Sequence, residues 1–123
     1  MDDQTTVLRE ELSQLLRKAA EIKVRFDRAA GTVRGVPHYS VIESTAHEFG
    51  QVVSRMVQAM HLAEVVADYP QFARCPQCET RSQLKVKKRQ VLSGDGPVEI
   101  QELVGECPCC RRAFFPATRD ARL

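Results

Sequence analysis

The feature that most constrains the fold is a pair of short cysteine motifs in the second half of the chain. Cys75-Pro-Gln-Cys78 and Cys107-Pro-Cys-Cys110 are both C-P-x-C sequences, and 28 residues separate their inner cysteines. A C-x-x-C turn delivers two thiolates to one metal ion, and tetrahedral Zn²⁺ takes four such ligands at about 2.3 Å. Two of these turns joined by hairpin-like sequence are typical of a zinc ribbon. We therefore predict a structural Zn²⁺ site formed by Cys75, Cys78, Cys107 and Cys110.

Three further observations refine this metal site. Cys109 is the fifth cysteine, and the C-P-x-C frame leaves it as a free thiol. His38, His47 and His61 have no H-x-x-x-H spacing, so we expect none of them to bind metal. Four cysteine ligands indicate a closed, structural site without an open catalytic position. Iron also accepts four thiolates, so the sequence alone leaves Zn²⁺ and iron open.

Composition and termini favour an intracellular globular protein. Hydrophobic residues make up 43% of the chain and charged residues 28%, which excludes wholesale disorder. The sequence has no apolar run of about 18 residues, so we expect no transmembrane helix and no membrane partner. The first residues, Met1-Asp2-Asp3-Gln4, are acidic and unlike a signal peptide. We therefore expect a cytoplasmic location, where paired cysteines favour metal over disulfides.

Residues 7–30 have the pattern of an amphipathic helix. Their apolar positions are separated by alternating steps of four and three, which is a heptad repeat. These positions are Leu8, Leu12, Leu15, Ala19, Ile22, Phe26 and Ala29. Gly31 follows the last of them and predicts the end of the helix. Residues 31–38 contain two glycines and a proline, which indicates a loop.

A second helix is predicted to follow the loop and to run to about Asp68, before Pro70. Ser40 and Glu43 form an S-x-x-E capping box at its start, although Pro37 at a first helical position would suit a slightly earlier start. Its apolar stripe again steps by three and four, and we expect the methionines of this stripe to be core residues. The stripe consists of Tyr39, Ile42, Ala46, Phe49, Val53, Met56, Met60, Ala63 and Ala67.

The two helices predict an antiparallel helical hairpin over residues 1–70. The second helix carries additional apolar residues outside its stripe, and one partner helix cannot cover both sets. The additional residues are Val41, Val52, Val57, Leu62, Val65 and Val66. We therefore expect a further contact, either a homodimer that forms a four-helix bundle or another domain.

Residues 71–123 are predicted to form the zinc-ribbon domain, which makes the whole chain an α+β fold. Residues 83–92 and 98–104 have the alternating pattern of strands, and the turn-forming run of residues 93–97 joins them. After the second cysteine motif, Phe114 and Phe115 are the candidates to pack on so small a ribbon.

Positive charge is concentrated in the same part of the chain. Residues 1–70 contain 8 Lys and Arg against 10 Asp and Glu, whereas residues 71–123 contain 10 against 6. This asymmetry favours a polyanionic partner such as DNA. The candidate contact residues are Lys85, Lys87, Lys88, Arg89, Arg111 and Arg112. The alternative is that Glu99, Glu102 and Glu106 neutralise the basic strand through cross-strand ion pairs.

The ribbon sequence resembles the N-terminal zinc-ribbon region of bacterial insertion-sequence transposases. The resemblance is carried by Cys75-Pro-Gln-Cys78, Gly96-Pro-Val-Glu-Ile100 and the run from Cys107 to Pro116, which ends in Phe-Phe-Pro. It covers residues 70–120 well and the helices only in outline. It implies a ribbon that helps to recognise or hold DNA. The RNase H-like catalytic domain of such transposases is expected to be absent from this chain.

Two classes of function therefore remain open. The first is a DNA-binding or assembly module in which the ribbon carries the phosphate contacts. The second is an interaction adaptor in which the helices dimerise or dock a partner and the metal only stabilises the ribbon. A rubredoxin-like electron carrier is disfavoured by the basic charge, and a thioredoxin-like enzyme by the missing βαβ context. The sequence shows no nucleophile–base pair and no phosphate loop, so we expect neither catalysis nor a small-molecule substrate.

Overall fold

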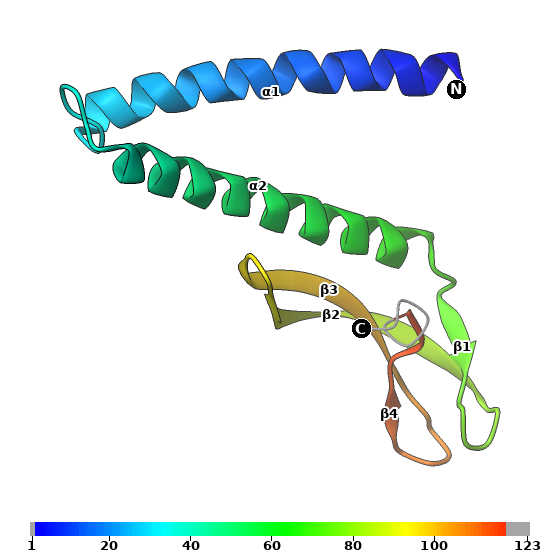
Figure 1. Cartoon of the computed structure of the whole chain (residues 1–123). Helices are drawn as coiled ribbons and strands as arrows, with labels where there is room; N and C mark the ends of the chain where they lie inside the picture. The colour runs from blue at the N-terminus through cyan, green and yellow to red at the C-terminus, as the bar shows by residue number, and fades with distance from the viewer. Residues whose placement is uncertain (1, 118–123) are drawn as a thin grey trace. The chain divides into compact units, whose positions relative to one another are not determined.

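The computed structural model describes residues 2–117 and has two long helices followed by a small antiparallel sheet (Figure 1). The helices and strands are α1 (Asp3–Ala30), α2 (Tyr39–Asp68), β1 (Phe72–Arg74), β2 (Arg81–Ser93), β3 (Gly96–Glu106) and β4 (Ala113–Phe114). The strands lie in the order β1-β2-β3-β4, and all neighbouring pairs are antiparallel. The predicted α+β class with a helical hairpin is confirmed. In the described part of the chain, no helix is both long and apolar enough to cross a membrane.

Local capping explains where α1 begins and ends. The side chain of Asp2 accepts a hydrogen bond from the backbone N–H of Thr5 at 3.0 Å, so the helix starts four residues before the predicted Val7. Gly31 adopts a φ of 77° and its N–H donates to the carbonyl of Arg28. This left-handed conformation is accessible to glycine at little cost, and it ends the helix at the predicted place.

The start of α2 differs from the prediction. The imidazole Nδ1 of His38 accepts the backbone N–H of Ser40 at 3.1 Å, and the carbonyl of His38 accepts the N–H of Val41 at 3.0 Å. Ser40 therefore lies inside the first turn, and the capping box of Ser40 and Glu43 is wrong. The physical reason is that the ring nitrogen of His38 accepts the N–H of Ser40, which the carboxylate of Glu43 would accept in the capping box.

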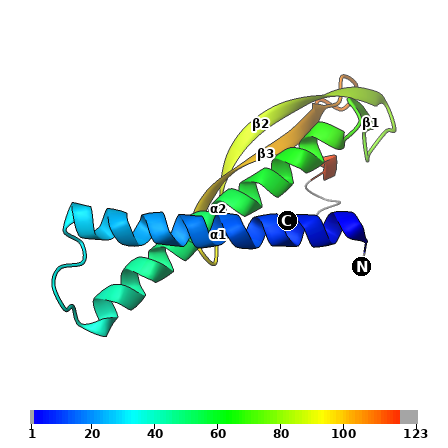
Figure 2. The ribbon, with the colours of Figure 1, turned by 90° about the horizontal axis from the view of Figure 1, so that it is seen from above.

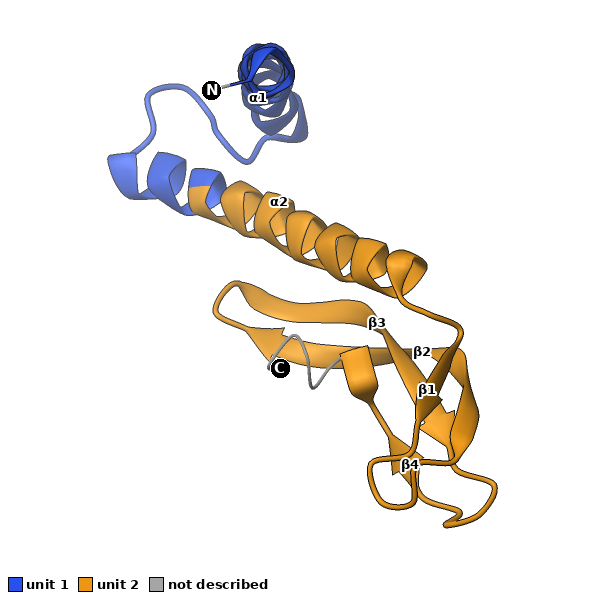
Figure 3. Cartoon of the chain, turned by 90° about the vertical axis from the view of Figure 1, so that its right-hand side faces the viewer, with its two compact units in different colours: residues 1–46 blue, residues 47–123 orange. Residues whose placement is uncertain are grey.

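The chain divides into two compact units, residues 1–46 and residues 47–123 (Figure 3). In the first unit, a buried carboxylate ties α1 to the start of α2. Asp27 is only 5% exposed, and it is bound by the ammonium group of Lys23 and the hydroxyl of Thr45. A buried charge requires such partners, so this cluster fixes the corner of the helical hairpin.

In the second unit, residues 47–68 of α2 run along the β2–β3 hairpin (Figures 1 and 2). The hydroxyl of Ser54 donates to the carboxylate of Asp95 at 2.6 Å, and Arg55 donates to the carbonyl of Asp95 at 2.8 Å. The expected domain boundary after residue 70 coincides with the end of α2, whereas the compact units divide at residue 46. The difference arises because the later part of α2 contacts the ribbon at Ser54, Arg55 and Val66.

The core of the second unit is small and lies at the cysteine end of the hairpin. Leu84, Leu103 and Ala117 are buried together. The partly buried residues packed against them are Val66, Tyr69, Ala73 and Phe114. An extra contact was expected for the valines of α2 that lie outside its stripe. Val66 makes such a contact with the ribbon of the same chain.

The apolar stripes of the two helices are largely exposed. Met56 is 55% and Met60 69% exposed, so the expectation that they are core residues is wrong for the single chain. The leucines of the α1 stripe are 54% to 60% exposed.

Candidate metal centre and basic face

The first cysteine motif forms a tight turn between β1 and β2. The N–H of Cys75 donates to the carbonyl of Thr80 at 3.0 Å, and the N–H of Glu79 donates to the carbonyl of Cys75 at 2.9 Å. Glu79 has a φ of 62°, which reverses the chain directly after the second cysteine of the motif. Both thiols are thereby brought to the same side of the turn.

The second motif repeats this geometry between β3 and β4. The N–H of Cys107 donates to the carbonyl of Arg112 at 3.1 Å, and the N–H of Arg111 donates to the carbonyl of Cys107 at 2.8 Å. Arg111 has a φ of 58°, nearly that of its counterpart in the first turn. The two C-P-x-C sequences therefore fold as the same knuckle, because the same spacing imposes the same hydrogen bonds.

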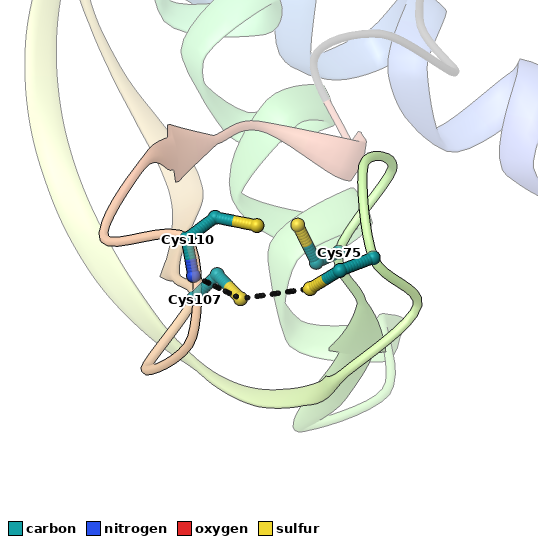
Figure 4. A group of neighbouring side chains, drawn as sticks. Cys75, Cys107 and Cys110 are labelled. Atoms are coloured by element: carbon teal, nitrogen blue, oxygen red, sulfur yellow. Dashed lines mark hydrogen bonds between the residues drawn. The ribbon is translucent and has the colours of Figure 1, made fainter.

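The two knuckles bring four sulfur atoms together. The Sγ atoms of Cys75, Cys78, Cys107 and Cys110 all lie within 4.8 Å of one another. The labelled side chains of Cys75, Cys107 and Cys110 point their sulfurs toward one another (Figure 4). Four thiolates around one tetrahedral ion at about 2.3 Å are separated by about 3.8 Å. The cluster therefore fits a single four-coordinate metal ion.

Backbone amides provide a further shell around this cluster. The N–H of Gln77 points at the Sγ of Cys75 over 3.4 Å, and the N–H of Cys110 points at the Sγ of Cys107 over 3.3 Å. Such N–H···S bonds stabilise thiolate charge and orient the ligands before metal binds. Cys75 and Cys107 are buried, whereas Cys78 is exposed.

The thiols of the cluster differ in acidity. Hydrogen bonds from Thr80, chiefly from its hydroxyl at 3.1 Å, lower the pKa of Cys78 to about 6. A hydrogen bond to Cys78 and burial raise the pKa of Cys110 to about 12. Without metal at neutral pH, Cys78 is therefore a thiolate and Cys110 retains its proton.

The fifth cysteine lies outside the cluster. Cys109 is exposed, and the negative charge of Cys78 raises its pKa. It is not among the four residues that can hold the metal, which agrees with the prediction of a free thiol.

Comparison of the chain with protein-family models, curated proteins and solved structures finds no match in any of the three. The resemblance to a transposase N-terminal region therefore stays a hypothesis.

Two of the six candidate nucleic-acid residues form cross-strand ion pairs. Arg89 Nε lies 3.0 Å from a carboxylate oxygen of the buried Glu102, and Lys88 lies 3.7 Å from Glu99. The alternative interpretation of the basic strand therefore applies to these two residues. The pair of Lys88 and Glu99 is exposed on both sides and contributes little to stability.

The register of β2 and β3 places the lysines of β2 on two opposite faces of the hairpin. Lys85 pairs with Val104 and Lys87 with Glu102, so both lie on one face of the hairpin, whereas Lys88 lies on the other. Within residues 2–117, Lys85 and Lys87 have no ion pair. Arg111 and Arg112 are also exposed and unpaired in this range, but they lie on the second knuckle.

The hairpin buries opposite faces in its two halves. Val98, Ile100 and Glu102 are buried near the turn, whereas Leu103 and Leu84 are buried near the knuckles. Because a two-stranded ribbon twists strongly, the side that packs against the rest of the unit changes along its length. At the knuckle end, the face that carries Lys85 is therefore the open one.

Sequence reasoning missed four residues on this open face. Arg74 is the register partner of Arg81, and Phe72 is the partner of Gln83. Together with Lys85 these residues form one face of β1 and β2. Because β1 has only three residues, its pairing is set by the first knuckle, and no periodicity in the sequence reveals it.

Proposed function

We propose that this chain is a zinc-ribbon module that binds DNA, with no catalytic activity of its own. The observation that carries the proposal is the four-cysteine cluster, which lies beside a sheet face whose lysines, Lys85 and Lys87, have no ion pair among the described residues. Phosphates are the natural partners of such lysines, and they give affinity with little sequence selectivity. Descent from a transposase N-terminus is consistent with this function.

Zinc is the metal that we propose for the four-cysteine centre. A closed set of four thiolates in tetrahedral arrangement suits Zn²⁺, and it favours a structural role for the ion. An iron site of the rubredoxin type is the alternative, but the ribbon is basic and has only Phe72, Phe114 and Phe115 as aromatic side chains.

Fluorescence anisotropy of the metal-loaded protein with labelled duplex DNA tests the proposal across a salt series. The affinity should fall steeply with salt, because each phosphate contact contributes about 0.9 to the slope of log K against log salt. Reversal of Lys85 and Lys87 to Glu should abolish binding at moderate salt. Lys88→Glu is the matched control, because Lys88 lies on the opposite face beside Glu99. Absence of binding at low salt and about 10 μM protein would contradict the proposal.

A second candidate function is favoured by the exposed apolar stripe of α1. Leu8, Leu12 and Leu15 are more than half exposed along a heptad repeat. Such a stripe marks a protein contact, and a second copy of this chain offers the same stripe in return. In this interpretation the chain is a homodimeric adaptor in which the metal only stabilises the ribbon. Association without any affinity for DNA would favour the adaptor.

A further inference from the structure

We infer that the open sheet face beside the first knuckle binds a single-stranded stretch of nucleic acid. This knuckle face consists of Phe72, Arg74, Arg81, Gln83 and Lys85, which share one side of β1 and β2. The inference rests on the proposed function and deepens it, because it names the surface and the form of nucleic acid. Among these residues, only Lys85 belongs to the contact set predicted from the sequence.

The first argument is uncompensated charge. Arg74 and Arg81 are directly opposite each other in the antiparallel pairing of β1 and β2. Like charges at such positions destabilise a sheet. Within residues 2–117 neither arginine has a carboxylate partner, whereas Lys88 and Arg89 further along β2 do. An anionic ligand at this face would remove the repulsion, and phosphate is the anion that guanidinium groups bind in bidentate geometry.

The second argument is a stacking surface. The guanidinium carbon of Arg81 lies 4.0 Å from the centroid of the Phe72 ring, and Phe72 is 40% exposed. The ring holds the planar guanidinium against the sheet, so its second side offers a flat surface. Unpaired bases stack on aromatic rings and on arginine planes. Bases within a duplex are already stacked on one another, so this surface suits a single strand.

The third argument is a hollow next to this stack. A pocket of about 300 Å³ adjoins Arg81, and its volume is at the lower end of the range for small-ligand pockets. It is lined by Arg81, Ser82, Gln83, Lys85, Val104, Glu106 and Pro108. Arg81 and Lys85 supply cations for phosphate, and the amide of Gln83 offers a donor and an acceptor for a base edge. Among the described residues of the lining, Glu106 is the one carboxylate, and its charge opposes a polyanion.

The metal centre holds the knuckle face in place. Cys75 follows Arg74 directly, and the N–H of Cys75 donates to the carbonyl of Thr80, the residue before Arg81. The two arginines therefore flank the turn that presents the first pair of thiols. Loss of the metal should release this turn and weaken nucleic-acid binding together with it.

Anisotropy with the full-length, metal-loaded chain tests this inference. The probes are labelled oligo-dT, oligo-rU and a mixed-sequence duplex, all of about 20 nucleotides, so that several binding sites fit on each. We expect at least one single strand to bind about 5-fold or more tightly than the duplex. Phe72→Leu and Arg81→Gln should each weaken single-strand binding by about 5-fold or more, and Lys88→Gln should leave it unchanged.

A gain-of-affinity variant keeps the test independent of folding defects. Glu106→Gln removes the opposing carboxylate and should tighten single-strand binding. Preference for the duplex, or unchanged single-strand affinity in both Arg81→Gln and Glu106→Gln, would overturn the inference. In that case, loss of duplex binding on reversal of Lys85 and Lys87 would leave the proposed function standing. Failure of the wild-type chain to bind any of the three probes would overturn both.

Discussion

Hydrogen bonds around Cys78 distribute the protons of the metal centre unevenly. Its thiolate accepts from the hydroxyl of Thr80 and lies 3.4 Å from the sulfur of Cys107. The ligand spacing made all four cysteines predictable, because a C-x-x-C turn is a local structure. The acidity of Cys78 was not predictable, because it depends chiefly on how the hydroxyl and backbone of Thr80 lie relative to the sulfur, and the C-x-x-C spacing does not specify that.

The metal affinity should therefore depend on pH, and the dependence should steepen at low pH. Cys110, with its pKa raised to about 12, must lose a proton to bind metal at any physiological pH. Affinity should rise about tenfold per pH unit for each proton displaced between pH 6 and 8. Below the pKa of Cys78, about 6, a further proton competes and the decline should steepen. Zn²⁺ competition with a chromophoric chelator measures this, and an affinity independent of pH would contradict the assignment.

Gly105 is a residue whose role depends on close packing. A Cβ atom at this position would lie 2.5 Å from the ring of Phe114 and 3.0 Å from Leu84. Gly105→Ala should therefore lower the stability of the metal-loaded protein by about 1–3 kcal/mol. Gly94→Ala is the matched control, because no atom lies within 4 Å of the added Cβ. Thermal unfolding compares the two variants, and equal midpoints would show that β4 does not pack as described.

At the level of elements, local patterns predicted the long helices and the β2–β3 hairpin but not the short strands. Heptad spacing and alternation lie within each element, so the sequence carries them directly. β1 and β4 have three and two residues, and their pairing follows from the knuckles. The covering of the ribbon by α2 is a tertiary contact. Its polar part, between Ser54, Arg55 and Asp95, leaves no periodic signal.

Removal of the metal should affect hydrogen exchange differently in the two parts of α2. Residues 47–68 belong to the same compact unit as the ribbon, so hydrogen exchange should accelerate there and in β2 and β3 when a chelator strips the protein. Residues 3–30 should keep their protection. Peptide-resolved exchange by mass spectrometry measures both regions. Unchanged protection of the whole of α2 would place the boundary after residue 70, at the end of the helix.

For the molecule as a whole, the main open question is what covers the exposed apolar stripes. Phe26 is 62% exposed and Met60 69%, although the heptad pattern identifies both as residues that need covering. Periodicity predicts which apolar side chains should be buried, but it does not say whether the same chain or another chain buries them. This is why periodicity identifies Met56 and Met60 as core residues although both are more than half exposed.

We expect the chain to dimerise through the α1 stripe. Sedimentation velocity at about 10–100 μM should show a dimer, because an interface of standard size supports micromolar or tighter affinity. Leu12→Glu combined with Leu15→Glu should shift the protein to monomer by placing charges in an apolar seam. Gln14→Glu is the control, since Gln14 lies on the same helix outside the stripe. A wild-type monomer over this range would contradict the dimer.

The central claim is that four cysteines hold one metal ion that stabilises the ribbon. Metal analysis and native mass spectrometry of protein purified under reducing conditions test it most directly. We predict one zinc ion per chain, lost in Cys78→Ser and retained in Cys109→Ser, together with a tetrahedral thiolate spectrum after replacement by Co²⁺. A wild-type chain that folds without stoichiometric metal, or equal metal loss in both variants, would contradict the account.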